Sequence, residues 1–126
     1  MEFSEAGAAA PASCVWPTVA SVEQWEETIM PTFIITMNWT EQGIRNIKDA
    51  PKRAAAAREM AKKLGVEIKQ TYLTNGPSDL LSIVESPSGD NVAKFCMAIG
   101  QLGNVRTSTV RAWSEADYAK FISELP

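Results

Sequence analysis

Two short stretches of the sequence bring together the residue types that a small-molecule site needs. The loop WTEQGIR, which begins at Trp39, offers a flat apolar ring, polar side chains and the cation of Arg45. The turn GPSD, which begins at Gly76, ends on a carboxylate. An apolar wall beside a few placed polar groups is typical of ligand pockets. We therefore predict a pocket rim, with a further cation on a later polar strand. Its candidate ligand-binding residues are Trp39, Thr40, Gln42, Arg45, Gly76, Asp79 and Arg106.

Each of these features also has a structural interpretation. The loop after Trp39 can simply be a connection with a capping threonine, and Asp79 can accept hydrogen bonds from the backbone of its own turn. A single aspartate without a histidine or a second carboxylate nearby in sequence is a weak sign of catalysis. Cys96 follows Phe95 on an apolar helical stripe, which favours a buried, unreactive thiol over a nucleophile.

The sequence contains no histidine. Its absence excludes a histidine-dependent catalytic triad, a histidine metal site and an imidazole proton shuttle. Catalysis would have to depend on carboxylates, a thiol, lysine or tyrosine. We therefore expect no metal and no cofactor, and the sequence assigns no catalytic residue.

Basic residues are concentrated between Arg45 and Lys69, where the sequence has eight basic and three acidic residues. Such an excess can attract a phosphate or a nucleic acid. The alternative is a solvated helix face, on which Glu59 and Lys63 are spaced as an i,i+4 pair. Aromatic residues do not alternate with these bases, so the stretch does not favour nucleic-acid stacking.

The charge also divides the chain near Met30. Residues 1–29 carry five acids and no base, whereas all twelve bases lie in 30–126. The first segment has no apolar period, so we expect an acidic, mostly disordered extension before a domain that covers 30–126. Residues Trp25-Glu26-Glu27 imply a purine-rich codon run of the kind that bacterial ribosomes bind. We infer that Met30 is the natural start and that 1–29 are translated leader.

The 126 residues suffice for one domain with a real core. Apolar residues make up 45% of the chain, yet no run approaches the ~20 residues of a spanning helix, so no membrane contact is expected. Two distant cysteines do not suggest a disulfide framework. Reduced thiols and a cytoplasmic location are therefore expected.

Apolar periods and turn signals predict seven elements. Strands are expected at 32–39, 66–73, 80–85 and 105–111, and helices at 50–64, from a cap at Ser88 or Asp90 to about 102, and at 114–125. Residues 40–43 are expected to be a loop, and Gly76 to permit the backbone angles of a tight turn. Asp49 and Ser114 are expected helix caps. The residues expected to face the core are Ala54, Ala57, Ala61 and Leu64 in the first helix, Val92, Phe95, Cys96 and Ile99 in the second, and Tyr118, Phe121, Ile122 and Leu125 in the last.

The order βαββαβα contains the split βαβ, or ferredoxin-like, arrangement, an α+β fold with a four-stranded antiparallel sheet and two helices on one face. Both faces carry apolar side chains, with Ile34 and Val84 expected on one face and Phe33 and Ile83 on the other, so the face without helices is also partly apolar. A second copy of the chain is the simplest cover for it. We therefore predict a homodimer of the dimeric α/β-barrel kind, joined through the open sheet face.

Three segments of the sequence resemble the GYD-domain family of small bacterial proteins in the dimeric α/β-barrel group. They are FIITMNWTEQGIRNIKDAPKR, YLTNGPSDLLSIVE and LGNVRTSTVRAWSEADY. The family's Gly-x-Tyr-Asp turn is matched by Gly76 and Asp79, with Ser78 in place of the tyrosine. The resemblance implies the barrel-type dimer and little chemistry. The segments GPSDLLSIVE and GNVRTSTV are also similar to the effector-binding domain of Lrp/AsnC-type regulators, whose helix-turn-helix is not seen in this sequence.

Two functions follow as hypotheses. The first is a dimeric module without catalysis that binds a small, anionic metabolite at the subunit interface or acts as a sensor, in which Arg45 or Arg106 supplies charge and Trp39 an apolar wall. The alternative is a cofactor-free oxygenase- or isomerase-like enzyme of the same barrel group, which would need Asp79 or Glu85 beside an arginine in an enclosed cavity. A third interpretation is an interaction protein without a ligand.

Overall fold

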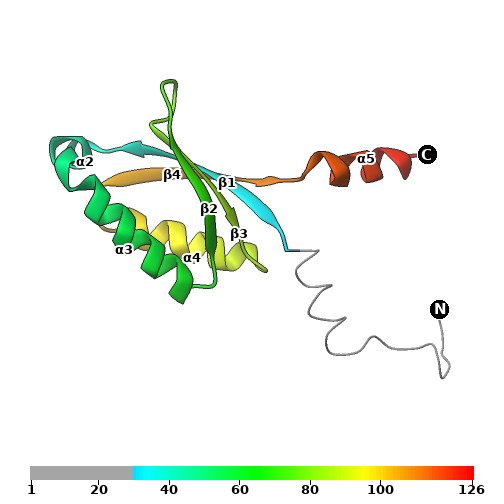
Figure 1. Cartoon of the computed structure of the whole chain (residues 1–126), viewed down its shortest axis with the longest axis horizontal. Helices are drawn as coiled ribbons and strands as arrows, with labels where there is room; N and C mark the ends of the chain where they lie inside the picture. The colour runs from blue at the N-terminus through cyan, green and yellow to red at the C-terminus, as the bar shows by residue number, and fades with distance from the viewer. Residues whose placement is uncertain (1–29) are drawn as a thin grey trace. The chain divides into compact units, whose positions relative to one another are not determined.

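The computed structural model describes residues 30–126, so the expectations for residues 1–29 lie outside the described range. The elements follow the predicted order, with two short additions after the first strand (Figure 1). They are β1 Thr32–Trp39, α2 Glu41–Arg45, η1 Ile47–Asp49, α3 Ala50–Lys63, β2 Glu67–Leu73, β3 Leu80–Glu85, α4 Gly89–Gly100, β4 Val105–Ala112 and α5 Glu115–Ser123.

The strands form one antiparallel sheet in the order β2-β3-β1-β4. Helices α3 and α4 lie on the same side of this sheet (Figure 1). The predicted ferredoxin-like α+β fold is thereby confirmed. Along β1 every second side chain faces the helices, so Ile35 lies between Ser82 of β3 and Thr109 of β4 on the covered face.

The core lies between the sheet and the two helices, and its centre is Ile35 and Val84, which are both fully buried. The other buried apolar residues are Ala61, Val66, Val92, Phe95 and Ile99. Three of the four side chains predicted to be buried in α4 are among them. The fourth, Cys96, is only half-buried, and its Sγ lies 3.3 Å from Oγ1 of Thr109.

Several predicted helix ends are confirmed. The Ser88 Oγ accepts a hydrogen bond from the Asp90 amide, and the Ser114 Oγ accepts one from the Asp117 amide. Gly65 follows α3 with φ of 77°, and Gly103 follows α4 with φ of 85°. Such left-handed backbone suits glycine, which has no Cβ to clash with the carbonyl.

Three local predictions are wrong. Residues 40–43 are not a loop but the start of α2, because the Thr40 hydroxyl accepts from the Gly43 amide and begins a helical turn. Asp49 makes no side-chain cap, because η1 runs into α3 and its backbone is already helical there. Gly76 is not among the left-handed glycines of the described residues, so its turn does not require glycine for that reason.

The predicted inner face of α3 is correct for three positions and wrong for one. Ala57, Ala61 and Leu64 pack on the core, whereas Ala54 is exposed. Ala54 lies one turn before Ala57, where the alanine side chains are too short to reach the sheet. The space left in front of them forms the cavity described in the next subsection.

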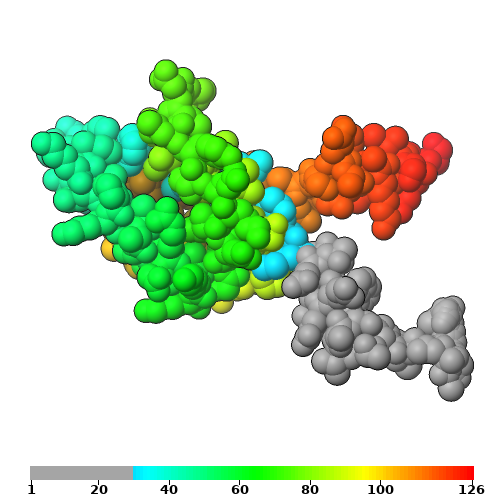
Figure 2. All heavy atoms as spheres, viewed as in Figure 1, coloured from blue at the N-terminus to red at the C-terminus, as the bar shows by residue number. Residues whose placement is uncertain are grey.

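Helix α5 contradicts the prediction of a buried apolar stripe. Its apolar side chains Tyr118, Phe121 and Ile122 are between 45% and 57% exposed, and Leu125 just beyond it is 67% exposed. The helix stands clear of the sheet and of α3 and α4 (Figure 2). Its Phe121 ring meets Trp113 edge to face, with ring centroids 6.0 Å apart. The helix is amphipathic as predicted, but no surface within residues 30–126 covers its apolar side.

The sheet face opposite the helices is open and partly apolar. Ile34 lies between Ile83 of β3 and Val110 of β4, and Leu81 lies opposite Tyr72 of β2 on the same face. Val110 and Tyr72 are about half exposed. The predicted homodimer would cover this face, and it stays a prediction. Among the helices of the described range, none has the length and apolar character needed to cross a bilayer.

Candidate functional site

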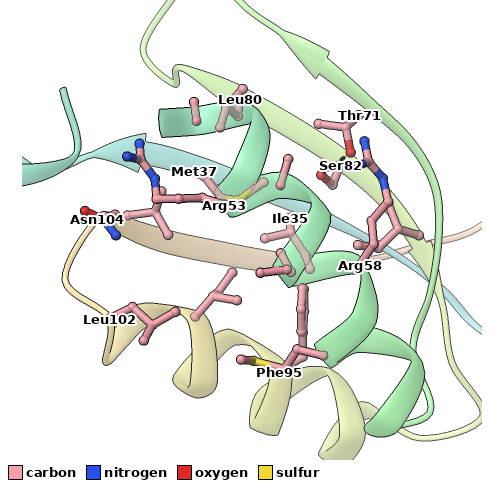
Figure 3. A pocket seen from close by; sticks show the side chains of 18 of the residues that line it. Ile35, Met37, Arg53, Arg58, Thr71, Leu80, Ser82, Phe95, Leu102 and Asn104 are labelled. Carbon is pink, nitrogen blue, oxygen red and sulfur yellow. Dashed lines mark hydrogen bonds between the residues drawn. The ribbon is translucent and has the colours of Figure 1, made fainter. Parts of the chain in front are cut away.

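A cavity of about 520 Å³ lies between α3, α4 and the covered face of the sheet (Figure 3). Its volume is in the range of small-molecule pockets, which is about 300–1,000 Å³. The walls are predominantly apolar. The sheet contributes Ile35, Met37, Ile68 and Leu80, and the helices contribute Met60, Phe95 and Ile99.

The alanine-rich part of α3 explains why this space is not filled. Ala54 and Ala57 line the cavity where larger side chains would pack against Ile35 and Leu80. Protein interiors are normally filled with few voids larger than a water molecule. A long apolar hollow under a helix therefore indicates either a ligand or another chain as its occupant.

One pair of polar side chains belongs to the cavity wall. The hydroxyls of Thr71 on β2 and Ser82 on β3 lie 2.9 Å apart and form a hydrogen bond. Ser82 is only 4% exposed, although it lies between Leu80 and Val84 on the core-facing side of its strand. The pair therefore gives a polar feature to an otherwise apolar wall.

Two arginines of α3 line the cavity and differ in their partners. The Arg53 guanidinium donates to the carbonyls of Gly43 (3.1 Å) and Asn46 (2.8 Å), so it holds the end of α2. Arg58 forms no hydrogen bond or ion pair with any residue of 30–126. In Figure 3 its guanidinium extends toward the part of the cavity where Thr71 and Ser82 lie.

Trp39 is the predicted site residue that lines this cavity. It lies at the end of β1, and its backbone amide donates to Oδ2 of Asp79 at 2.9 Å. The Asp79 amide donates to the carbonyl of Met37 and to Oδ1 of Asn38. Asp79 therefore fastens the β2–β3 connection to β1, and it does not line the cavity.

Thr40 and Gln42 join the first strand to the last. The Thr40 hydroxyl donates to the carbonyl of Gly103 at 2.5 Å, and its backbone amide donates to the carbonyl of Asn104. The Gln42 amide nitrogen donates to the carbonyl of Leu102 and to Oδ1 of Asn104. Both side chains therefore hold the α2 turn against the connection between α4 and β4.

The remaining predicted residues lie elsewhere. Arg45 is exposed and pairs with Glu41 of its own helix at 2.9 Å. Arg106 is exposed on β4, opposite Asn38 on the open face of the sheet. Gly76 lies in the β2–β3 connection, where a Cβ added to it would meet no heavy atom within 4 Å. The structure thus brings Trp39, Thr40, Gln42 and Asp79 to one end of the sheet, and Arg106 lies at the same end but on the open face.

Two arginines line the cavity, but no acidic residue of the described range does. Of the described residues, no aspartate, glutamate, lysine, tyrosine or cysteine lines it. Within residues 30–126 no three metal-ligating side chains gather. The pKa of Lys69 is raised, chiefly by its hydrogen bond to Glu67 and also by the charge of Glu85, but this group lies at the edge of the sheet and outside the cavity.

Sequence reasoning does not find Arg58, Thr71 and Ser82. The basic stretch favours a solvated face for Arg58, and its side chain is exposed, but it also lines the cavity. Ser82 offers a clearer signal, because a serine alternates with Leu80 and Val84 on the apolar side of β3. A hydroxyl in that position is buried and needs a partner.

Comparison with known proteins agrees with the fold. Residues 33–122 match the GYD domain family. A Thermus thermophilus protein described as a glutamine synthetase and cystathionine beta-lyase binding protein is 30% identical over 89 residues, which cover 70% of this chain and 94% of that protein.

Two solved structures of Mycobacterium tuberculosis regulators share the fold. A feast or famine regulatory protein in complex with L-methionine is 15% identical, with a TM-score of 0.51 over 80% of this chain and 61% of that one. A leucine response regulatory protein is 14% identical, with a TM-score of 0.51 over 90% of this chain and 65% of that one. This chain thus spans less than two thirds of either regulator. The likeness agrees with the predicted similarity to Lrp/AsnC-type domains, and the family match shows that the chain belongs to the GYD-domain family.

Proposed function

We propose that this protein is a homodimeric module that binds a small metabolite in the cavity beneath α3. The observation that carries this proposal is the cavity itself, an apolar hollow of about 520 Å³ with a hydroxyl pair and an arginine at its wall. An apolar body with a few placed polar groups matches the usual composition of ligand pockets.

The lining favours binding over catalysis. An enzyme of the cofactor-free oxygenase or isomerase kind would need a base near the substrate. Asp79 and Glu85, the two carboxylates considered for that role, do not line the cavity, and Asp79 already accepts the amide of Trp39. The half-buried thiol of Cys96 is also absent from its lining.

The homodimer is part of this proposal. Ile34, Ile83 and Val110 form adjacent apolar pairs at the centre of the open face, and Leu81 and Tyr72 extend them toward β2. A contiguous exposed apolar surface of this kind usually marks an interface. A second copy covers it with a matching surface, because the same residues meet across a two-fold axis.

A second candidate function is the binding of an enzyme. The relative that is 30% identical, and that aligns over 94% of its length, is named for binding glutamine synthetase and cystathionine beta-lyase. The exposed apolar stripe of α5 and the open sheet face are surfaces that could serve such an interaction. Co-elution of this protein with purified glutamine synthetase of its own host on a gel-filtration column would support this candidate.

The metabolite proposal is tested by thermal shift across amino acids, keto acids and short fatty acids. Binding to the folded state raises the melting temperature as ligand concentration increases. The variant Ala57→Phe fills the cavity, so it should abolish the shift. Ala55→Phe is the matched control, because Ala55 is exposed on the same helix and does not line the cavity.

The two variants give a clear outcome. A shift that survives in Ala55→Phe and disappears in Ala57→Phe supports binding in this cavity. A shift that is equal in both variants would place the ligand elsewhere and contradict the proposal. A flat response of the unmodified protein across the whole panel would contradict it as well.

A further inference from the structure

The hydroxyl groups of Thr71 and Ser82 carry one hydrogen that their mutual hydrogen bond does not use. Thr71 and Ser82 each carry one hydroxyl hydrogen, and their 2.9 Å contact uses only one of them. Whichever residue donates, the other keeps its hydrogen for a further acceptor. Among residues 30–126 neither hydroxyl forms a second hydrogen bond. When Thr71 donates, the remaining hydrogen belongs to Ser82, which is buried, so its partner is an acceptor within the cavity. When Ser82 donates, the remaining hydrogen belongs to Thr71, whose side chain is exposed.

Arg58 adds a positive charge to the same part of the cavity. The side chain lines the cavity and extends toward Thr71 and Ser82 (Figure 3). The comparison with Arg53 is informative, because Arg53 donates to two backbone carbonyls and Arg58 to no residue of the described range. A guanidinium presents its donors in a planar fork that matches a carboxylate.

From these features we propose that the ligand of the cavity is a small apolar carboxylic acid. Its carboxylate would accept from the Arg58 guanidinium and from the spare hydroxyl hydrogen of the Thr71–Ser82 pair, while its apolar body lies among Ile35, Leu80 and Phe95. This inference rests on the proposed function. It also excludes amines, because no carboxylate of the described residues lines the cavity to receive an ammonium group.

Three ligands with the same alkyl chain and different head groups show how much the head group contributes to the affinity. Octanoate, octanol and octylamine share the same chain, and their affinities for the full-length protein are measured by isothermal titration calorimetry. Octanoate should bind about 10-fold more tightly than octanol, since a hydrogen bond to a charged group is stronger than one between neutral groups. Octylamine should bind more weakly than octanol.

Variants then show whether the preference for octanoate depends on Arg58 and on the Thr71 hydroxyl. Arg58→Gln should weaken octanoate about 10-fold and leave octanol unchanged, because it removes the charge and the guanidinium donors and keeps the apolar lining. Lys63→Gln is the matched control, since it also removes a positive charge from α3. The Lys63 side chain is exposed and does not line the cavity. Thr71→Val, which keeps the shape of an exposed side chain, should weaken octanoate about 3-fold.

The results separate this inference from the function on which it rests. Equal affinities for octanoate and octanol, or an Arg58→Gln variant that binds octanoate as well as Lys63→Gln, would overturn the carboxylate assignment and leave metabolite binding intact. If none of the three probes binds, this inference falls. The proposed function falls with it only if the metabolite panel also gives no shift that Ala57→Phe removes.

Discussion

The backbone amide of Trp39 donates a hydrogen bond of 2.9 Å to Oδ2 of Asp79, 40 residues further along the chain. The bond ties the end of β1 to the connection between β2 and β3, and Trp39 lines the cavity. Asp79 is the residue that matches the aspartate of the family's turn. Its position indicates that this aspartate holds the backbone beside the site and does not act on a ligand.

Replacing this carboxylate should therefore lower stability. Asp79→Ala should reduce the free energy of unfolding by about 1.5–3 kcal/mol, because a hydrogen bond to a charged group is lost and the Trp39 amide is left without an acceptor. Asp79→Asn keeps an acceptor oxygen and should lose about half as much. Urea unfolding followed by circular dichroism measures both. Equal stability of Asp79→Ala and the unmodified protein would contradict the structural role.

Gly43 lies where no side chain fits. A Cβ on this residue would stand 2.0 Å from the carbonyl oxygen of Asn104, whereas a Cβ on Gly76 would meet nothing within 4 Å. Gly43→Ala should thus cost about 1–3 kcal/mol of stability, the usual range for forcing an atom into a packed site. Gly76→Ala is the matched control and should stay within about 0.5 kcal/mol of the unmodified protein. A Gly43→Ala variant as stable as Gly76→Ala would show that the α2 junction can move.

The open sheet face should carry the subunit contact. Val110 is 57% exposed there, so Val110→Lys costs little in the single chain but places a charge in the dimer interface. The variant should sediment as a monomer at micromolar concentration in an analytical ultracentrifuge. Met97→Lys is the control, because Met97 is 67% exposed on α4, away from that face. A Val110→Lys variant that remains as dimeric as Met97→Lys would rule out this interface.

The stripe of α5 should add little to the stability of a single chain. The double substitution Phe121→Ser and Ile122→Ser should change the free energy of unfolding by no more than about 0.5 kcal/mol, because both side chains are exposed. The measurement is best made in the Val110→Lys background, where association through the sheet face is removed. A loss of several kcal/mol would mean that α5 packs on the body in solution.

Much of the fold could be predicted from local patterns. The alternation in β1 and the turn signals on either side of β3 predict the bounds of these strands. The helix-end signals at Ser88, Ser114, Gly65 and Gly103 are also present in the sequence itself. The short helix α2 could not be predicted in this way. Its Thr40 cap is local, but its position also depends on Gly43 lying against Asn104, a contact between residues 61 positions apart.

The site was less predictable than the fold, because its features are set by tertiary contacts. Arg53 and Arg58 are the same residue type on one helix, and only the structure shows that Arg53 is bonded to α2. The sequence predicts that Ala54 and Ala57 face a filled core, whereas both residues line a cavity. The sequence predicts Gln42 as a ligand contact, whereas its amide bonds to the connection before β4.

The sheet order also bears on how the chain is made. β1 is synthesised first, but it lies between β3 and β4, and the last of these ends at Ala112. Its two hydrogen-bonded edges therefore cannot both be satisfied until β4 has left the ribosome. Pairing between such distant segments is slow, and an unpaired apolar strand is prone to aggregation in the meantime. Nascent chains of this protein should consequently depend on protection of β1 until β4 has been synthesised.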